Sequence, residues 1–175
     1  MVVVALVGFS GSRSLSASFS GQVAGLVASV TSCGRGVAVG CASGLDSFVR
    51  SACSGASVFR ASSMRPAALV SRSVEMVQAV AGSGPGCGLV VFPGCACPVG
   101  LGPSRSPSRC FCGLGSGSWA TAALAVGLGV PVVVFGVSAE DLPVSWGAWS
   151  PAGSGAWVSG FRLVPPAQPV QQSLF

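Results

Sequence analysis

The sequence predicts one α/β domain built on a doubly wound, mostly parallel β-sheet with helices on both faces. A length of 175 residues suits one domain with a buried core and is too short for two ordinary domains. Short β-branched runs, apolar at consecutive positions, recur along the chain, as expected of strands covered on both faces. The intervals between them have room for helices, and alternating strands and helices imply right-handed crossover connections.

The expected elements follow this alternation along the chain. Parallel strands are expected at 2–7, 37–41, 57–61, 89–92 and 132–135, and a further strand at 156–164. Helices are expected at 19–32, 44–53, 66–81 and 118–128. The domain then spans 1–164, with an insertion at 94–115 rich in Cys, Pro, Gly and Ser, and an extended tail follows at 165–175.

Three of the helices carry signals for their first residues. Ser43 and Asp46 have the spacing of a capping box, in which each side chain bonds the backbone amide of the other. Pro66 suits the first position of a helix, where its missing N–H costs nothing. Ser116 is a candidate N-cap for the fourth helix.

The composition limits the possible classes of function but does not identify one. Half of the residues are apolar and 7% are charged, against roughly 25% in an ordinary soluble domain. The net charge of +5 permits a phosphate or nucleic-acid partner but does not demonstrate one. The longest uncharged apolar run, 122–137, is too short to span a membrane, and the first residues lack a basic leader. We therefore expect a cytoplasmic protein with reduced cysteines and no membrane partner.

Loops rich in glycine and serine follow the first, second and fourth strands, where a parallel α/β sheet binds its ligands. Glycines in such loops let several backbone N–H groups face one anion, and the amino end of a following helix favours the same charge. Asp46 is either a capping residue or an acceptor for a ribose or base. The loop residues expected to bind phosphate or a nucleotide are Gly11, Ser12, Arg13, Ser43, Gly44, Asp46, Gly115, Ser116, Gly117 and Ser118.

Five segments of the chain form a recognisable set: VGFSGSRS, GCASGLDSFVRSA, SRSVEMV with Arg72 and Glu75, VVFPG, and GSGSWATAALAVGLGVPVVVF. In these segments the chain resembles the Rossmann-like domain shared by DNA-processing protein A (DprA, or Smf) and the Lonely Guy phosphoribohydrolases. The five segments cover most of residues 2–136 in the family's order. The resemblance implies a nucleotide- or nucleic-acid-binding crevice that adds Arg72 to the loop residues above.

The chain departs from the phosphoribohydrolases where their catalytic glutamate stands, because Thr121 occupies that place. Glu75 and Asp46 remain as candidate catalytic acids or bases, although Glu75 is also spaced to form an i,i+3 ion pair with Arg72. The segment GSGSWATA is closer to the DprA type, which binds DNA in recombination.

Three classes of function stay open. We expect first a non-catalytic binding protein of DNA metabolism, without a cofactor, in which Arg13, Arg72 and Arg60 contact the phosphates of a nucleotide or single-stranded nucleic acid. The first alternative is a nucleotide phosphoribohydrolase, an N-glycosidase-type enzyme. The second is a self-assembling structural or nucleotide-sensing protein, since a surface with few charges favours a homo-oligomer.

Cysteines, tryptophans and the tail give further hypotheses. Cys95, Cys97, Cys110 and Cys112 bracket the insertion and either hold Zn²⁺, close disulfides or stay free thiols. Trp146, Trp149 and Trp157 favour a core or subunit interface over stacking on bases.

The last five residues, QQSLF, resemble the short peptide by which bacterial replication and repair proteins bind the DNA polymerase sliding clamp. In that interpretation Leu174 and Phe175 fill an apolar pocket while Gln171 hydrogen-bonds its rim. The alternative is a tail that packs on its own domain or on a neighbour.

Overall fold

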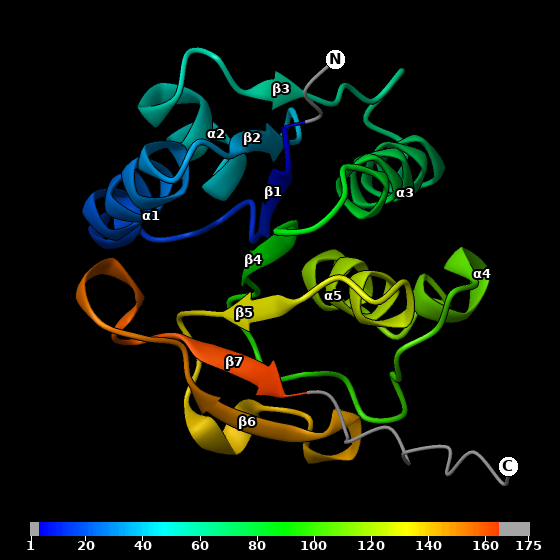
Figure 1. The fold of residues 1–175 in the computed structure, drawn as a ribbon. Coiled ribbons are helices and arrows are strands. Elements are labelled where there is room, and N and C mark those ends of the chain that lie inside the picture. The colour runs from blue at the N-terminus through cyan, green and yellow to red at the C-terminus, as the bar shows by residue number, and fades with distance from the viewer. Residues whose placement is uncertain (1–3, 165–175) are drawn as a thin grey trace, which may run out of the picture.

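A seven-stranded sheet forms the centre of the molecule in the computed structural model, which describes residues 4–164 (Figure 1). The strands are β1 (Leu6–Gly11), β2 (Gly36–Val39), β3 (Ser57–Val58), β4 (Gly88–Phe92), β5 (Val132–Val134), β6 (Ala148–Pro151) and β7 (Phe161–Val164). Their order across the sheet is β3-β2-β1-β4-β5-β7-β6. The first five strands are parallel, whereas β7 pairs antiparallel with both β5 and β6. The α/β class and the mostly parallel sheet are confirmed.

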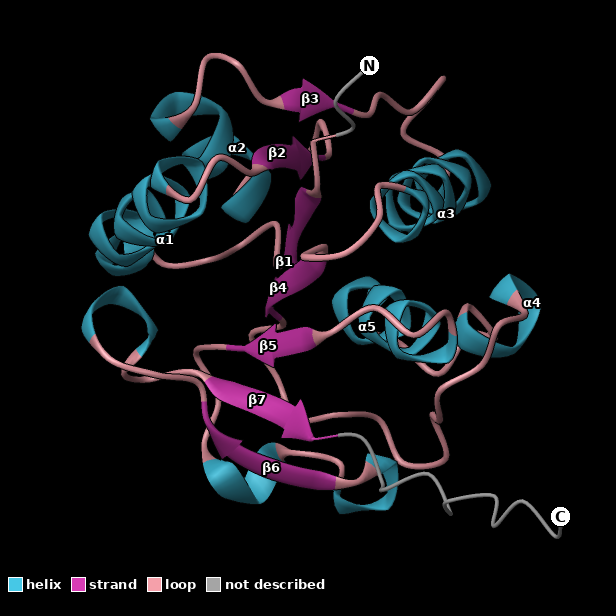
Figure 2. Cartoon of the chain, in the orientation of Figure 1, coloured by secondary structure: helices cyan, strands magenta, loops and turns pink. Residues whose placement is uncertain are grey.

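Helices flank this sheet on both sides (Figure 2). They are α1 (Ser20–Ser32), α2 (Leu45–Ala52), α3 (Pro66–Gly82), α4 (Pro107–Cys110) and α5 (Gly117–Gly127), with short 3-10 turns at η1 (Ala17–Phe19), η2 (Ala139–Asp141), η3 (Val144–Trp146) and η4 (Gly155–Trp157). Figure 1 shows α1 and α2 on one side of the sheet and α3, α4 and α5 on the other. In the part of the chain that the structure describes, no helix has the length and apolar character needed to cross a membrane.

Each side of the sheet has its own apolar core. On the α1 side, the rings of Phe92 and Phe135 stack with their centroids 5.1 Å apart. On the other side, Trp119 of α5 meets Trp146 edge to face at 5.7 Å. Helix α5 is buried on every residue from Ser118 to Ala125, and its many alanines let it lie close to α3 and β4. The expected core role is confirmed for Trp146, which is buried.

Strand β1 lies further along the chain than predicted. It begins at Leu6 and includes Gly11, which the sequence assigned to the following loop. The pairing with β4 extends to Gly11 opposite Phe92, and the Ser12 amide adds a hydrogen bond of 2.8 Å to the Phe92 carbonyl. The ladder to β4 thus continues through the glycine-serine motif, and the turn starts only at Ser12.

The carboxyl-terminal part of the domain also differs from the prediction. The strand expected at 156–164 is confirmed only over its second half, because the 3-10 turn η4 precedes a shorter β7. A strand that was not predicted, β6, forms a hairpin with β7 at the edge of the sheet. The fourth predicted strand and the first position of α3, Pro66, agree closely with the structure.

Candidate functional site

A pocket of about 390 Å³ opens at the carboxyl ends of β1, β2 and β4. Its lining comes from the loops after these strands, one face of α3, the start of α5 and two residues of the insertion. The lining residues are Phe9, Ser10, Gly11, Ser12, Arg13, Gly40, Ala42, Asp46, Pro66, Leu69, Val70, Arg72, Ser73, Met76, Pro93, Cys95, Phe111, Ser116, Gly117, Ser118 and Thr121.

The structure brings most of the expected binding residues to this one pocket. Those that line it are Gly11, Ser12, Arg13, Asp46, Arg72, Ser116, Gly117 and Ser118. Ser43, Gly44 and Gly115 lie in the expected loops but do not line it. Glu75 and Arg60 are exposed and also lie outside the lining.

The first and second loops pack directly against each other. The Ser12 carbonyl accepts a hydrogen bond of 3.2 Å from the Leu45 amide at the start of α2. Gly44 has a φ of +66°, and a Cβ there would overlap the backbone of Ser12 and Arg13. At Gly11, a Cβ would lie 2.6 Å from Leu45 Cδ2. Both positions require glycine because the two loops leave no space for a side chain.

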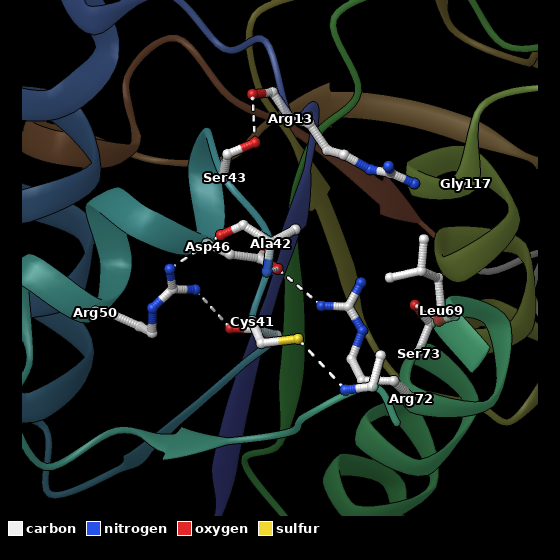
Figure 3. A network of polar contacts seen from close by, with 12 residues as sticks. Arg13, Cys41, Ala42, Ser43, Asp46, Arg50, Leu69, Arg72, Ser73 and Gly117 are labelled. Atoms are coloured by element: carbon white, nitrogen blue, oxygen red, sulfur yellow. Dashed lines mark hydrogen bonds and ion pairs between the residues drawn. The ribbon is translucent and has the colours of Figure 1, made fainter. Parts of the chain in front are cut away.

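Asp46 joins the second loop to α3. Its Oδ2 accepts the Ala42 amide at 3.0 Å and Arg72 Nη1 at 2.8 Å. The ion pair is well covered, with 6% of the Asp46 side chain and 12% of the Arg72 side chain exposed. Figure 3 shows this contact, with Arg72 and Arg13 both extending toward the same space and Arg13 reaching toward Gly117.

This contact corrects two predictions. The capping box of Ser43 and Asp46 is wrong, because Gly44 is the N-cap of α2 and makes no side-chain cap. Ser43 Oγ instead donates to the Arg13 carbonyl at 3.2 Å. The alternative ion pair of Arg72 with Glu75 is also wrong, since Arg72 pairs with Asp46 across the pocket wall.

Arg50 fixes the backbone of the second loop from behind. Its Nη1 donates to the Gly40 carbonyl at 2.9 Å, and its Nη2 donates to the Ala42 carbonyl at 3.0 Å. Gly40 itself lies against the guanidinium of Arg72, which a Cβ at this position would overlap. Arg50 and Gly40 were not among the predicted site residues, although Gly40 directly follows β2 in the second glycine-rich loop.

The third loop leads into α5 through a strained residue. Ser116 has a φ of +48°, and in residues 4–164 it is the one non-glycine residue with positive φ. Its Oγ accepts the Trp119 amide at 3.3 Å, so its prediction as an N-cap is confirmed. Gly117 and Ser118, the first residues of α5, line the pocket. The first amides of a helix have no acceptor within the helix, and its positive end favours an anion.

Thr121 and Trp119 stabilise the same region from inside. Thr121 is buried, and its Oγ1 donates to the Gly117 carbonyl at 2.7 Å. Trp119 Nε1 donates to the Cys95 carbonyl at 2.8 Å, which ties α5 to the start of the insertion. The insertion therefore forms one wall of the pocket rather than a separate unit.

One face of α3 forms the opposite wall. Leu69, Arg72, Ser73 and Met76 all line the pocket and have the i, i+3, i+4, i+7 spacing of a single helical face. Of these four residues only Arg72 was predicted from the sequence, because the same spacing is typical of an ordinary core-facing stripe. Pro66 and Val70 extend the apolar part of the wall.

The cysteines of the insertion lie apart from any cluster of possible metal ligands among the described residues. Across residues 4–164, no group of three or more His, Cys, Asp or Glu side chains is placed to hold a metal ion. Cys95, Cys97, Cys110 and Cys112 are free thiols in this structure, and zinc binding by them stays a prediction. Burial, together with the neighbouring Cys95, raises the pKa of Cys97 to about 11. Burial also raises the pKa of Cys110.

No model of a known protein family, no curated protein and no solved structure matches this chain. The predicted clamp-binding residues Gln171, Leu174 and Phe175 lie outside the described residues.

Proposed function

We propose that this chain is a non-catalytic protein that binds a nucleotide, free or as part of a single nucleic-acid strand, in the pocket described above. We infer that its sheet is doubly wound and Rossmann-like, as in DprA. Strands β3-β2-β1-β4-β5 are parallel, and the helices change sides of the sheet between the β1-β2 half and the β4-β5 half. In such sheets the ligand binds where the strand order reverses, which corresponds to the gap between β1 and β4.

The convergence of Arg13, Arg72 and the first turn of α5 on one space carries this proposal (Figure 3). Two guanidinium groups and a helix amino end are a typical environment for a phosphate. The apolar face of α3, with Leu69 and Met76, offers the opposite wall to a sugar or base. A volume of about 390 Å³ falls within the range of small-molecule pockets.

The charges of the lining favour a singly charged phosphodiester over a polyphosphate. Arg13, Arg72 and Asp46 are the charged members of the lining, so two positive charges face one negative charge. A phosphate within a nucleic-acid strand matches this small positive excess.

The hydrolase alternative receives less support. Glu75 is exposed outside the pocket, and Asp46 already accepts two hydrogen bonds through Oδ2. Thr121 occupies the position of the catalytic glutamate in the phosphoribohydrolases that the chain resembles, and its hydroxyl donates a hydrogen bond to the Gly117 carbonyl. Asp46 is the one carboxylate among the described lining residues, so a hydrolase would have to use a group already engaged with Ala42 and Arg72 as its general acid or base. A role in DNA recombination in the cytoplasm, self-association and clamp binding by the tail are further parts of this proposal.

Fluorescence anisotropy with a short, labelled single DNA strand tests the proposal. We expect binding that weakens as salt rises, and we expect Arg13→Ala to weaken it about tenfold and to flatten the salt slope by about 0.7. Arg162→Ala, an exposed arginine on β7, is the matched control and should bind like the wild type. Absence of binding to strands and mononucleotides at low salt would refute the proposal, whereas release of free base from nucleoside monophosphates would favour the hydrolase.

A further inference from the structure

We propose that Asp46 is a positioning residue, which holds Arg72 in place for the ligand and does not itself contact the ligand. This inference rests on the proposed function, because it concerns how the same pocket binds an anion. It departs from the expectation that Asp46 accepts a hydrogen bond from a sugar or base.

The hydrogen bonds of Asp46 leave Oδ2 committed to the protein. Oδ2 accepts the Ala42 amide at 3.0 Å and Arg72 Nη1 at 2.8 Å, and the residue is only 5% exposed. A carboxylate that is buried and engaged in this way serves the protein's own structure better than an incoming hydroxyl group.

The loop just before α2 and Asp46 is itself held firmly. Arg50 bonds the carbonyls of Gly40 and Ala42, and the Ala42 amide bonds back to Asp46. Gly40 lacks a side chain where the Arg72 guanidinium lies, so that the guanidinium rests directly against the backbone. The loop therefore forms a cradle whose shape fits one position of Arg72.

Arg72 depends on this cradle for its position. Among the described residues, the hydrogen bonds of its side chain involve Nη1 alone, and its partner there is Asp46. Its Nε is buried without a hydrogen-bond partner. An arginine side chain has many rotamers, and losing Asp46 would remove the one polar contact that selects the rotamer directed at the pocket.

A positioning role for Asp46 can be distinguished from a simple effect of its negative charge, because the two predict opposite changes in anion affinity when Asp46 is removed. If Asp46 acts only as a negative charge, its removal makes the pocket more positive and tightens binding of an anion. If Asp46 positions Arg72, its removal weakens binding although the pocket becomes more positive. Asp46→Asn keeps an oxygen acceptor and Asp46→Ala keeps none, so both variants change the charge equally but only one preserves the contact.

The experiment measures the Kd of the labelled strand for the wild type, D46N and D46A, with urea unfolding as a check that each variant is folded. We expect D46A to bind about tenfold more weakly and D46N to stay within about threefold of the wild type. Glu75→Gln is the matched control, because it removes one exposed negative charge on α3 without a contact to Arg72. Its Kd should change by less than about twofold.

A second comparison keeps the inference testable if D46A unfolds. Adding D46N to Arg72→Ala should not weaken binding beyond Arg72→Ala alone, since a positioning residue acts through its partner. Equal tightening by D46N and D46A, or further weakening in the double variant, would overturn the positioning role and leave the proposed function intact. A wild-type protein that binds neither strands nor nucleotides would overturn both.

Discussion

The buried ion pair of Asp46 and Arg72 predicts a large and non-additive effect on stability. Arg72→Met leaves the Asp46 carboxylate buried without its cation, and Asp46→Leu leaves the guanidinium without its anion. Each should lower the free energy of unfolding by about 3–5 kcal/mol, because an uncompensated charge stays in a site that is 6% to 12% exposed. In the double variant no buried charge remains, and the main loss is the hydrogen bond to the Ala42 amide. That loss should cost about 1–3 kcal/mol, less than either single change.

Urea unfolding of the wild type, both single variants and the double variant measures these free energies in one cycle. The control is Arg162→Met, which replaces an exposed arginine on β7 and should cost less than about 0.5 kcal/mol. A double variant whose cost equals the two single costs added together would show that the residues do not act as a pair. The structural interpretation of the pocket wall would then be wrong.

Further predictions concern other parts of the fold. Gly11→Ala should destabilise the domain by about 1–3 kcal/mol, since its Cβ would lie 2.6 Å from a leucine side chain. Gly21→Ala in α1, where a Cβ meets nothing within 4 Å, should stabilise it by about 0.5 kcal/mol, and thermal unfolding compares the two. Ser116→Ala should cost about 1 kcal/mol in the same assay and Ser116→Gly only a few tenths, because glycine removes the cap but also the strain of positive φ. Burial raises the pKa of Cys97 to about 11, so alkylation mapped by mass spectrometry should label it later than the exposed Cys95 and speed up only as pH rises toward that value. Between pH 9 and pH 11 the Cys97 thiol keeps its proton in the folded state but loses it in the unfolded state, where its pKa is the ordinary 9.0. The free energy of unfolding should therefore fall as pH rises from about 9 to about 11. Equal labelling rates at pH 8, or stability that rises over that window, would contradict it.

The elements that local pattern determines could be predicted from the sequence. The five parallel strands and four longer helices were placed because β-branched runs and intervening helical segments follow one another regularly. Pro66 and Ser116 were assigned correctly because each acts on neighbouring backbone alone. Three glycine-serine loops were expected together because parallel strands bring their carboxyl ends to one edge.

Long-range contacts account for the errors. The extension of β1 through Gly11 depends on β4, which lies about 80 residues further along the chain. The capping box failed because Arg72 attracts the Asp46 side chain from another element, which spacing along one helix cannot reveal. Gly40 was not predicted for the same reason, since its role appears only where the second loop meets α3. Arg50 was not predicted because its bonds to the Gly40 and Ala42 carbonyls depend on how the second loop folds against α2. The β6–β7 hairpin was missed because its strands are short and half exposed.

The position of β4 between β1 and β5 has a consequence for synthesis of the chain on the ribosome. Through residue 82 the emerging chain carries β1, β2, β3 and α3, and one long edge of β1 still has no hydrogen-bonding neighbour. That edge is satisfied only when β4 is released, and Gly117 follows a further 25 residues later. A truncated chain that stops before α5 therefore exposes an unpaired strand and lacks one wall of the pocket. Such fragments are expected to aggregate, and the pocket is complete only once nearly the whole domain has been made.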